Sequence, residues 1–149
     1  MRGINDIKKY ALALGACNKI NGILTIKDAI TLLMTPQGRE FALKTGFPSI
    51  ELWRSTACNI FLPDNVILDD DKHGADESDL VIIGESFVSV IADNPVNLYH
   101  IMAMHGAEVE VKATNYAVVT VTNINSTVRI SNDGTAKVTV EQSEKGGSQ

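Results

Sequence analysis

Aromatic residues, cysteines and long apolar runs are all scarce in this chain of 149 residues. Only 5% of the residues are aromatic although 44% are hydrophobic, so the core must be built from Val, Ile, Leu and Ala. The two cysteines, Cys17 and Cys58, form no C-x-x-C pair, which excludes a zinc ribbon and a thioredoxin-like redox motif. We expect both to be buried, reduced thiols.

The distribution of charge and hydropathy also excludes classes of partner. No apolar run approaches the ~20 residues of a membrane span, and residues 1–10 are mixed polar without the apolar segment of a leader peptide. The net charge is −5 and the Lys and Arg residues are scattered, whereas a phosphate backbone is bound by clustered cations. We therefore expect a soluble protein made in a cytoplasm, with neither membrane nor nucleic acid as a partner.

The N-terminal region, 1–56, carries the pattern of four short helices, which are too small to be stable alone. Apolar residues recur near helical spacing in residues 4–14 and 23–33. The segment that follows holds a third helix, and a fourth is expected to start at the Phe47–Pro48 pair.

Cap residues mark the ends of these helices. Thr25 with Asp28 three residues later predicts a capping box. Thr35 before Pro36 predicts an N-cap followed by proline at the first helical position. Gly46 predicts a helix end in the left-handed conformation.

Residues 69–79, "DDDKHGADESD", are mostly acidic, with Lys72 as the only Lys or Arg. A solvated loop is the simplest interpretation. A Ca²⁺ site is the alternative, because hard cations prefer several carboxylates. The segment lacks the alternating ligands, central glycine and closing glutamate of an EF-hand, so we predict no metal site here.

From about residue 60 onward, apolar residues recur at every second position, as in β-strands. One motif is repeated: a small residue, a spacer, and two aliphatic residues two positions apart. Clear copies of this motif begin at Ser86, Ala107, Ala117, Ser126 and Ala136. The first interval is about twice as long as the others, which indicates a regular step of roughly ten positions. Residues two apart on a strand share a face, so the small and aliphatic residues face a core. The solvent face is then expected to carry Glu108, Glu110, Thr120, Arg129, Lys137 and Thr139.

Self-similarity at a fixed period is typical of solenoids and arrays. We expect Val109, Val119, Val128 and Val138 to stack in one column, each in a separate layer. Three architectures fit a ~10-residue repeat of one strand and one corner: a flattened solenoid with two repeats per coil, an intertwined trimer of chains, and an antiparallel meander. The predicted fold class is α+β, a short N-terminal helical region followed by a repetitive β region, either a β-solenoid or an intertwined trimeric β-helix.

The same patterns divide the chain into a helical capping or docking region, 1–56, a repetitive β region, 57–141, and a flexible polar tail, 142–149. A stack of strands leaves open edges at both ends. The helices can cap one end, whereas the tail is a poor cap for the other. We therefore expect a homo-oligomer, with a trimer favoured.

No set of residues predicts a reaction. His100 and His105 are five apart, which places them on opposite faces of a strand, and His105–Gly106 is expected to form a corner. Gly84–Ser86 is no nucleophile elbow, because Val88 stands where the second glycine belongs. Glu108 and Glu110 share a strand face and are interpreted as solubilising. We predict no catalytic residue, no cofactor and no metal ligand.

Three segments carry a resemblance to a known group of proteins: "LLMTPQGREFALKTGFPS", "LVIIGESFVSVIADNP" and "IMAMHGAEVEVKATNYAVVTV". The resemblance covers about half the chain, and it is to small proteins encoded by tailed phages and prophages of gut bacteria. In those proteins a helical head precedes a β-rich tail. The resemblance implies a phage context and carries over no catalytic residue.

Three hypotheses for function follow. The first is a non-catalytic virion structural protein, a fibre, spike or head/tail decoration that is assembled in the host cytoplasm and contacts other virion proteins. The second is an intracellular phage protein that sequesters a small host ligand at subunit interfaces, with Trp53, Arg54 or Tyr116 as contacts. The third is a carbohydrate-active β-solenoid.

Overall fold

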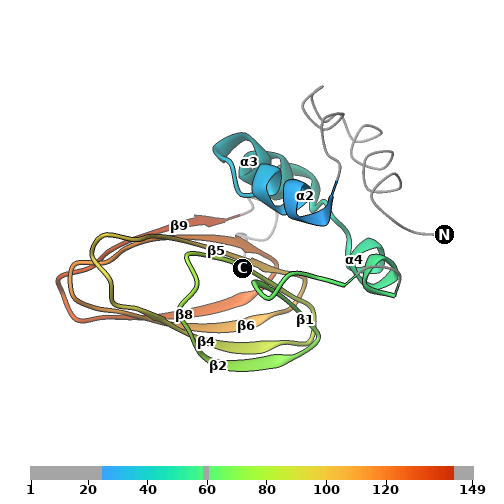
Figure 1. The fold of residues 1–149 in the computed structure, drawn as a ribbon. Helices are drawn as coiled ribbons and strands as arrows, with labels where there is room; N and C mark the ends of the chain where they lie inside the picture. The colour runs from blue at the N-terminus through green and yellow to red at the C-terminus, as the bar shows by residue number, and fades with distance from the viewer. Residues whose placement is uncertain (1–24, 59–60, 143–149) are drawn as a thin grey trace. The chain divides into compact units, whose positions relative to one another are not determined.

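The computed structural model describes residues 25–58 and 61–142. The helix expected at 4–14, Cys17 and tail residues 143–149 lie outside these ranges. The chain forms two compact units, Met1–Asp64 and Asn65–Gln149, and Figure 1 colours both along the chain.

Three helices form the described part of the first unit: α2 (Ile26–Leu33), α3 (Pro36–Thr45) and α4 (Ile50–Ala57). The capping box is confirmed, because the Asp28 N–H donates to Thr25 Oγ1 at 3.1 Å and the Thr25 N–H donates to Asp28 Oδ2 at 3.2 Å. Thr35 caps α3, and Gly46 ends it with φ 74°. Within residues 25–58 and 61–142, no helix has both the length and the apolar character needed to cross a bilayer.

The fourth expected helix exists but starts later than its sequence suggested. Ser49 is its N-cap, and the Ser49 hydroxyl accepts a hydrogen bond from the Leu52 N–H at 3.1 Å. The Phe47–Pro48 pair therefore precedes α4 instead of opening it. The expectation of a buried Cys58 is wrong, because this thiol is free and exposed at the C-cap of α4.

The helices pack through a small apolar cluster. Phe47 and Leu52 are buried at its centre, and Phe41 meets Phe47 edge to face with ring centroids 5.8 Å apart. A Cβ at Gly38 would lie 2.1 Å from the carbonyl oxygen of Leu32, so only glycine allows the start of α3 to approach the end of α2 this closely.

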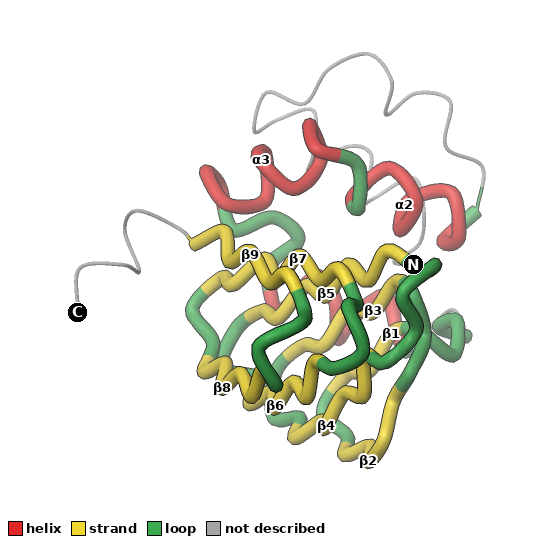
Figure 2. Tube along the Cα trace, turned by 90° about the vertical axis from the view of Figure 1, so that its left-hand side faces the viewer, coloured by secondary structure: helices red, strands yellow, loops and turns green. Residues whose placement is uncertain are grey.

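The second unit is a β-solenoid of about four coils, where one coil is two strands and two corners. Odd-numbered strands form a five-stranded sheet, even-numbered strands form a four-stranded sheet, and every pairing is parallel. Figure 2 shows the two sheets as stacked yellow layers joined by green corners. The strands are β1 (Val66–Leu68), β2 (Asp71–Ala75), β3 (Asp79–Ile83), β4 (Phe87–Ala92), β5 (Leu98–Met104), β6 (Glu108–Ala113), β7 (Val118–Ile124), β8 (Thr127–Asn132) and β9 (Lys137–Gln142).

Successive strands along the chain belong to opposite sheets, which corrects the expected column of valines. Val109 pairs with Val128 in the four-stranded sheet, one full coil later in the chain. Val119 pairs with Val138 in the five-stranded sheet, again one full coil later. The four valines therefore form two columns and not one, because each strand-and-corner step carries the chain across to the other sheet.

The space between the two sheets is filled by small and aliphatic side chains. One cluster holds them, with Tyr99 as its only aromatic member among the described residues. The predicted inward faces are confirmed for Val109, Val111, Val119 and Val121, all of them buried.

The sequence suggested a loop for the acidic segment 69–79, but part of this segment is a strand. Residues Asp71–Ala75 form β2, which pairs in parallel with β4. The pairing is irregular between Lys72 and Ala75, and Gly74 adopts φ 71° within it. Cross-coil backbone hydrogen bonding, which the local sequence does not reveal, makes this polar segment a strand.

The corners that follow the five-stranded sheet, here called the first corners, share one backbone feature. Asp69, Gly84, His105 and Asn125 occupy equivalent positions after β1, β3, β5 and β7, and all have positive φ between 53° and 74°. The N–H of each of the first three donates to a carbonyl of the next coil, as from His105 to Ile124 at 2.9 Å. The expected corner at His105–Gly106 is confirmed.

Candidate functional site

The carboxylates of the first coil cap backbone groups of the second coil. Asp69 Oδ1 accepts a hydrogen bond from the Glu85 N–H at 2.8 Å, and Asp71 Oδ1 accepts one from the Phe87 N–H at 3.1 Å. Ser86 Oγ accepts from the Asp70 N–H at 3.0 Å. These side chains thus satisfy backbone N–H groups at the corners where the first and second coils meet.

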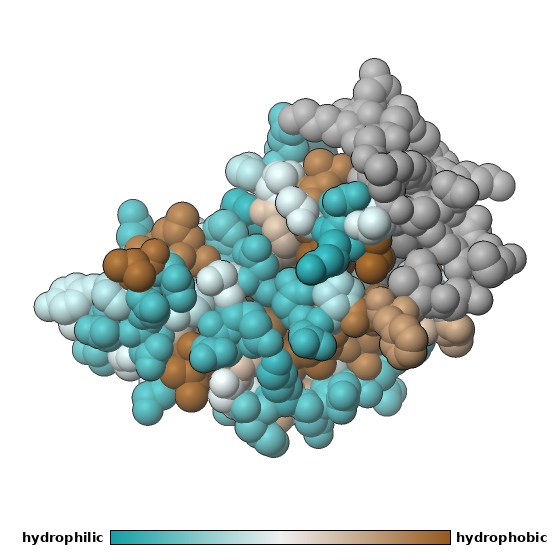
Figure 3. Space-filling view, viewed as in Figure 1, coloured by the Kyte–Doolittle hydropathy of each residue, from teal (hydrophilic) through white to brown (hydrophobic). Residues whose placement is uncertain are grey.

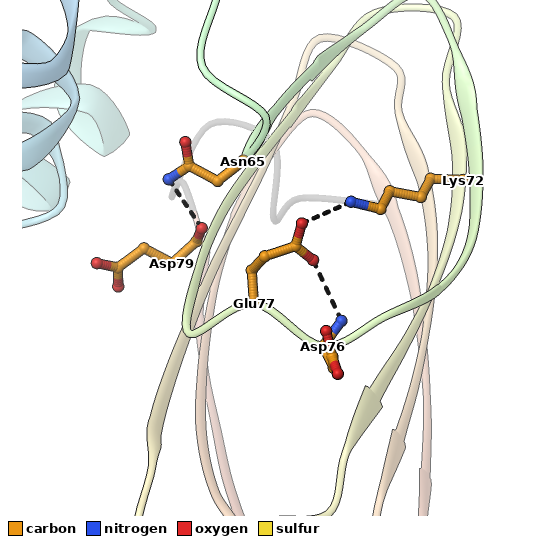
Figure 4. A network of polar contacts seen from close by, with 5 residues as sticks. All are labelled: Asn65, Lys72, Asp76, Glu77 and Asp79. Carbon is orange, nitrogen blue, oxygen red and sulfur yellow. Dashed lines mark hydrogen bonds and ion pairs between the residues drawn. The ribbon is translucent and has the colours of Figure 1, made fainter.

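Lys72 reaches from β2 to Glu77 in the loop before β3, with 2.5 Å between Nζ and Oε2 (Figure 4). Glu77 Oε1 also accepts a hydrogen bond from the Asp76 N–H at 3.2 Å. Burial alone would raise the pKa of Glu77, but the hydrogen bond and charge of Lys72 together with the backbone bonds hold this pKa below its ordinary value. Lys72 and Glu77 thus form an ion pair with each other. Nowhere in the described ranges do three or more His, Cys, Asp or Glu side chains gather to hold a metal ion.

The two histidines considered as candidate site residues, His100 and His105, occupy different kinds of position. His100 is on the outer face of β5, with Nδ1 3.5 Å from Asp79 Oδ1 on the neighbouring strand. Thr120 is the next residue in the same row, on β7. His105 forms a first corner.

Ser86 and the strand glutamates have structural contacts. The Ser86 hydroxyl donates to the Ile83 carbonyl at 2.9 Å and is buried, so it is committed to its corner. Glu110 pairs with Arg129 on the next coil, with 3.5 Å between Oε2 and Nη1. Glu108 is exposed beside it on the outer face of β6.

The three residues considered as ligand contacts are divided between the units. Trp53 and Arg54 lie on α4, where Trp53 is buried and Arg54 is exposed. Tyr116 lies in the solenoid at the corner between β6 and β7. Neither unit by itself contains all three.

The corners that precede β5, β7 and β9 are here called the second corners. These corners and the first residue of β5 carry the most exposed large apolar side chains of the solenoid. Val96 is 85%, Tyr116 68% and Leu98 62% exposed. We call these three residues the corner tip. Figure 3 shows brown surface at the left-hand end of the solenoid, the end at which β9 begins in Figure 1.

The corner tip is held by hydrogen bonds between successive coils. Asn115 Nδ2 donates to the Asp93 carbonyl at 3.0 Å, and the Tyr116 N–H donates to Thr135 Oγ1 at 2.9 Å. The hydroxyl of buried Tyr99 accepts from the Asn94 N–H at 3.2 Å, which ties the corner to the core. These bonds fix the backbone of the two corners that carry Val96 and Tyr116.

Tyr116 has φ 62°, a left-handed conformation that is unfavourable for an aromatic residue. The Asn115 before it has φ 56°. Two consecutive left-handed residues turn the Tyr116 ring outward into solvent instead of into the core. Strain of this kind persists only where surrounding contacts impose it, and it is concentrated at functional sites.

Sequence reasoning singled out Tyr116 but missed Val96 and Leu98. The signal was available, because Val96 stands inside the turn sequence Asn94–Pro95–Val96–Asn97, where an apolar residue has no strand face to occupy.

The last coil, β8 with β9, leaves inward-facing residues partly uncovered. Ile130 continues the column of Val111, and Val140 continues the column of Val121. Both terminal residues are 38% exposed, whereas Val111 and Val121 are buried. We call β8 and β9 the terminal coil. It is the second apolar surface of the solenoid.

The candidate binding features of the described residues are thus two apolar surfaces of the solenoid, the corner tip and the terminal coil. No protein-family model, curated protein or solved structure matches the chain.

Proposed function

We propose that this protein is a non-catalytic structural component of a tailed-phage virion, assembled in the host cytoplasm, whose solenoid presents the corner tip to another virion protein. The observation that carries the proposal is the corner tip itself. Val96, Leu98 and Tyr116 are large and exposed, and hydrogen bonds between coils hold Tyr116 and the neighbouring Asn115. Apolar side chains fixed on a rigid scaffold are typical anchors of protein interfaces.

The phage context is supported by the three sequence segments that resemble phage and prophage proteins. They include the last residues of α2 and all of α3 in the first unit, and most of β3 to β7 in the second. We propose that the helical unit docks on the particle and that the solenoid projects from it. The ten-residue repeat is proposed as the sequence unit of the solenoid, with two units in each coil.

Assembly from several copies is part of the same proposal. The trimer favoured from the sequence relied on chains winding round one another. Because one chain supplies both sheets of the solenoid, copies need only meet at their surfaces. We propose surface contacts between complete solenoids as the basis of the homo-oligomer.

Mass spectrometry of virions purified from the bacterium that carries the gene tests this function. We expect the chain among the particle proteins, and its absence from particles would overturn the proposal. The double variant Leu98→Ser/Tyr116→Ser should enter particles on the order of tenfold less well than wild type, as loss of about 1.4 kcal/mol at an interface implies. The control is Ile91→Ser, which removes an exposed apolar residue of β4 that is not part of the corner tip.

A further inference from the structure

Among the described strands, those of the terminal coil are the last, and β9 leaves one edge of the five-stranded sheet without a described partner strand. β9 pairs with β7 on one side, and on its other side no described strand follows. In the interior coils the same columns are completed by the next coil, which leaves Val111 and Val121 buried. An edge of this kind, with apolar residues behind it, accepts another strand.

The backbone of β9 determines which groups face that edge. The Lys137 N–H donates to the Ala117 carbonyl, so Lys137 directs its backbone groups toward β7. Backbone direction alternates along a strand, so Thr139 and Glu141 also bond toward β7. The N–H and C=O groups of Val138 and Val140 therefore point to the open edge.

The side chains of β9 are self-complementary about Thr139. Lys137 and Glu141 carry opposite charges at equal distances from Thr139 on the outer face, and Val138 and Val140 are identical on the inner face. The Glu141 carboxylate accepts a hydrogen bond from Thr122 Oγ1 at 2.9 Å, which places it on the outer face beside β7. In an antiparallel pair centred on Thr139, each Lys137 would lie opposite a Glu141.

We propose that β9 pairs in antiparallel fashion with β9 of a second copy of this chain, with the two-fold axis at Thr139. The four inter-chain hydrogen bonds join Val138 of each chain to Val140 of the other. In antiparallel strands, the backbone N–H and C=O groups of two facing residues must either both point toward the other strand or both point away from it. This register satisfies that condition, because Val138 faces Val140 of the second copy and Thr139 faces Thr139 of the second copy. The pairing joins two five-stranded sheets into one.

A second copy fits this edge better than an unrelated strand, because the same five residues supply matching charge, apolar face and backbone direction on both sides. A two-fold contact is also the commonest way in which identical chains associate. The inference rests on the proposed function for the expectation that copies assemble. It specifies the surface through which two of them meet.

Reversing the charge of Lys137 or Glu141 tests whether the partner of β9 is a second copy of this chain. Lys137→Glu and Glu141→Lys each place like charges opposite one another twice, so each variant alone should dimerise on the order of tenfold more weakly in analytical ultracentrifugation. An equimolar mixture of the two variants restores opposite charges at every position, and it should form a heterodimer with wild-type affinity. Lys112→Glu, on the outer face of β6, makes the same change of charge away from the edge and should leave dimerisation unchanged.

Disulfide trapping tests the register. In a background with Cys17 and Cys58 changed to serine, Thr139→Cys places two thiols opposite each other at a pair whose Cα atoms are about 4.5 Å apart, which suits a disulfide. We expect a covalent dimer under mild oxidation. Thr120→Cys, on the interior strand β7, should remain monomeric.

Each result decides the question. A wild-type chain that sediments as a monomer at all concentrations overturns the pairing, as does failure of the mixed variants to associate more tightly than either alone. Far-ultraviolet circular dichroism of every variant separates loss of pairing from loss of folding. A monomer that is nevertheless found in virions overturns this inference alone, whereas a dimer that is absent from virions overturns only the proposed function.

Discussion

Val121 and Val140 lie opposite each other on β7 and β9, yet Val121 is fully buried and Val140 is 38% exposed. The two residues are the same amino acid in the same column, one coil apart. The difference between them is therefore the presence of one more layer of side chains, which an interior coil has and the terminal coil lacks.

This relationship predicts unequal costs for the same substitution. Val121→Ala should lower the free energy of unfolding by about 2 kcal/mol, because it removes buried methyl groups and leaves a cavity. Val140→Ala should cost less than about 1 kcal/mol, since its side chain is already partly hydrated. Urea denaturation at a concentration where the protein is monomeric gives both values. Equal costs would show that the end of the stack is covered in solution.

Adjacent residues on β7 give a test of which face is inside. Val119→Asp places an unpaired carboxylate in the core between the sheets and should cost several kcal/mol. Thr120→Asp is on the outer, half-buried face and should cost less than about 1 kcal/mol. Thermal melts of the two variants compare them, and the reverse order would contradict the register of β7.

The left-handed conformation of Tyr116 predicts an ordering of substitutions at that position. Tyr116→Asn should be at least as stable as wild type, because asparagine tolerates positive φ. Tyr116→Val should be less stable than Tyr116→Asn by roughly 1–2 kcal/mol, because a β-branched side chain is disfavoured there. Chemical denaturation of the three proteins provides the measurement. If valine is tolerated as well as asparagine, the corner relaxes in solution.

The lowered pKa of Glu77 predicts an acid-dependent loss of stability. A carboxylate whose pKa is lower in the folded than in the unfolded chain stabilises the fold fully above its unfolded pKa, and this stabilisation is lost as the pH falls through the folded pKa. The stability difference between wild type and Glu77→Gln should therefore be constant at neutral pH and shrink below the ordinary value of 4.5. Denaturation curves across that range test it. Lys72→Gln should reduce the same component, because Lys72 supplies the opposing charge.

Local signals in the sequence determined the helix ends and the two-residue alternation of the strands. Thr25, Thr35 and Gly46 act within one helical turn of their own positions, so their roles follow from residue type and spacing. The inward direction of Val109 and Val119 likewise follows from alternation, because every second side chain of a strand shares a face.

The candidate surfaces could be predicted only in part. Tyr116 stood out in the sequence as a rare aromatic residue, but its positive φ depends on contacts with neighbouring coils. Its own N–H donates to Thr135, and the side chain of the preceding Asn115 donates to the Asp93 carbonyl. The self-complementary order of charges in β9 was visible in the sequence. Its significance depends on β9 being an edge, which is a property of the whole stack.

Only the tertiary structure decided how the strands are distributed. A ten-residue step of strand and corner is compatible with one sheet or two, because it does not specify the direction in which the chain turns at a corner. The polar residues 71–75 become a strand because Asp71 and its neighbours bond to backbone groups of the next coil along the chain. Such pairing depends on how many residues each coil contains, and that number is fixed by the packing of one coil on the next.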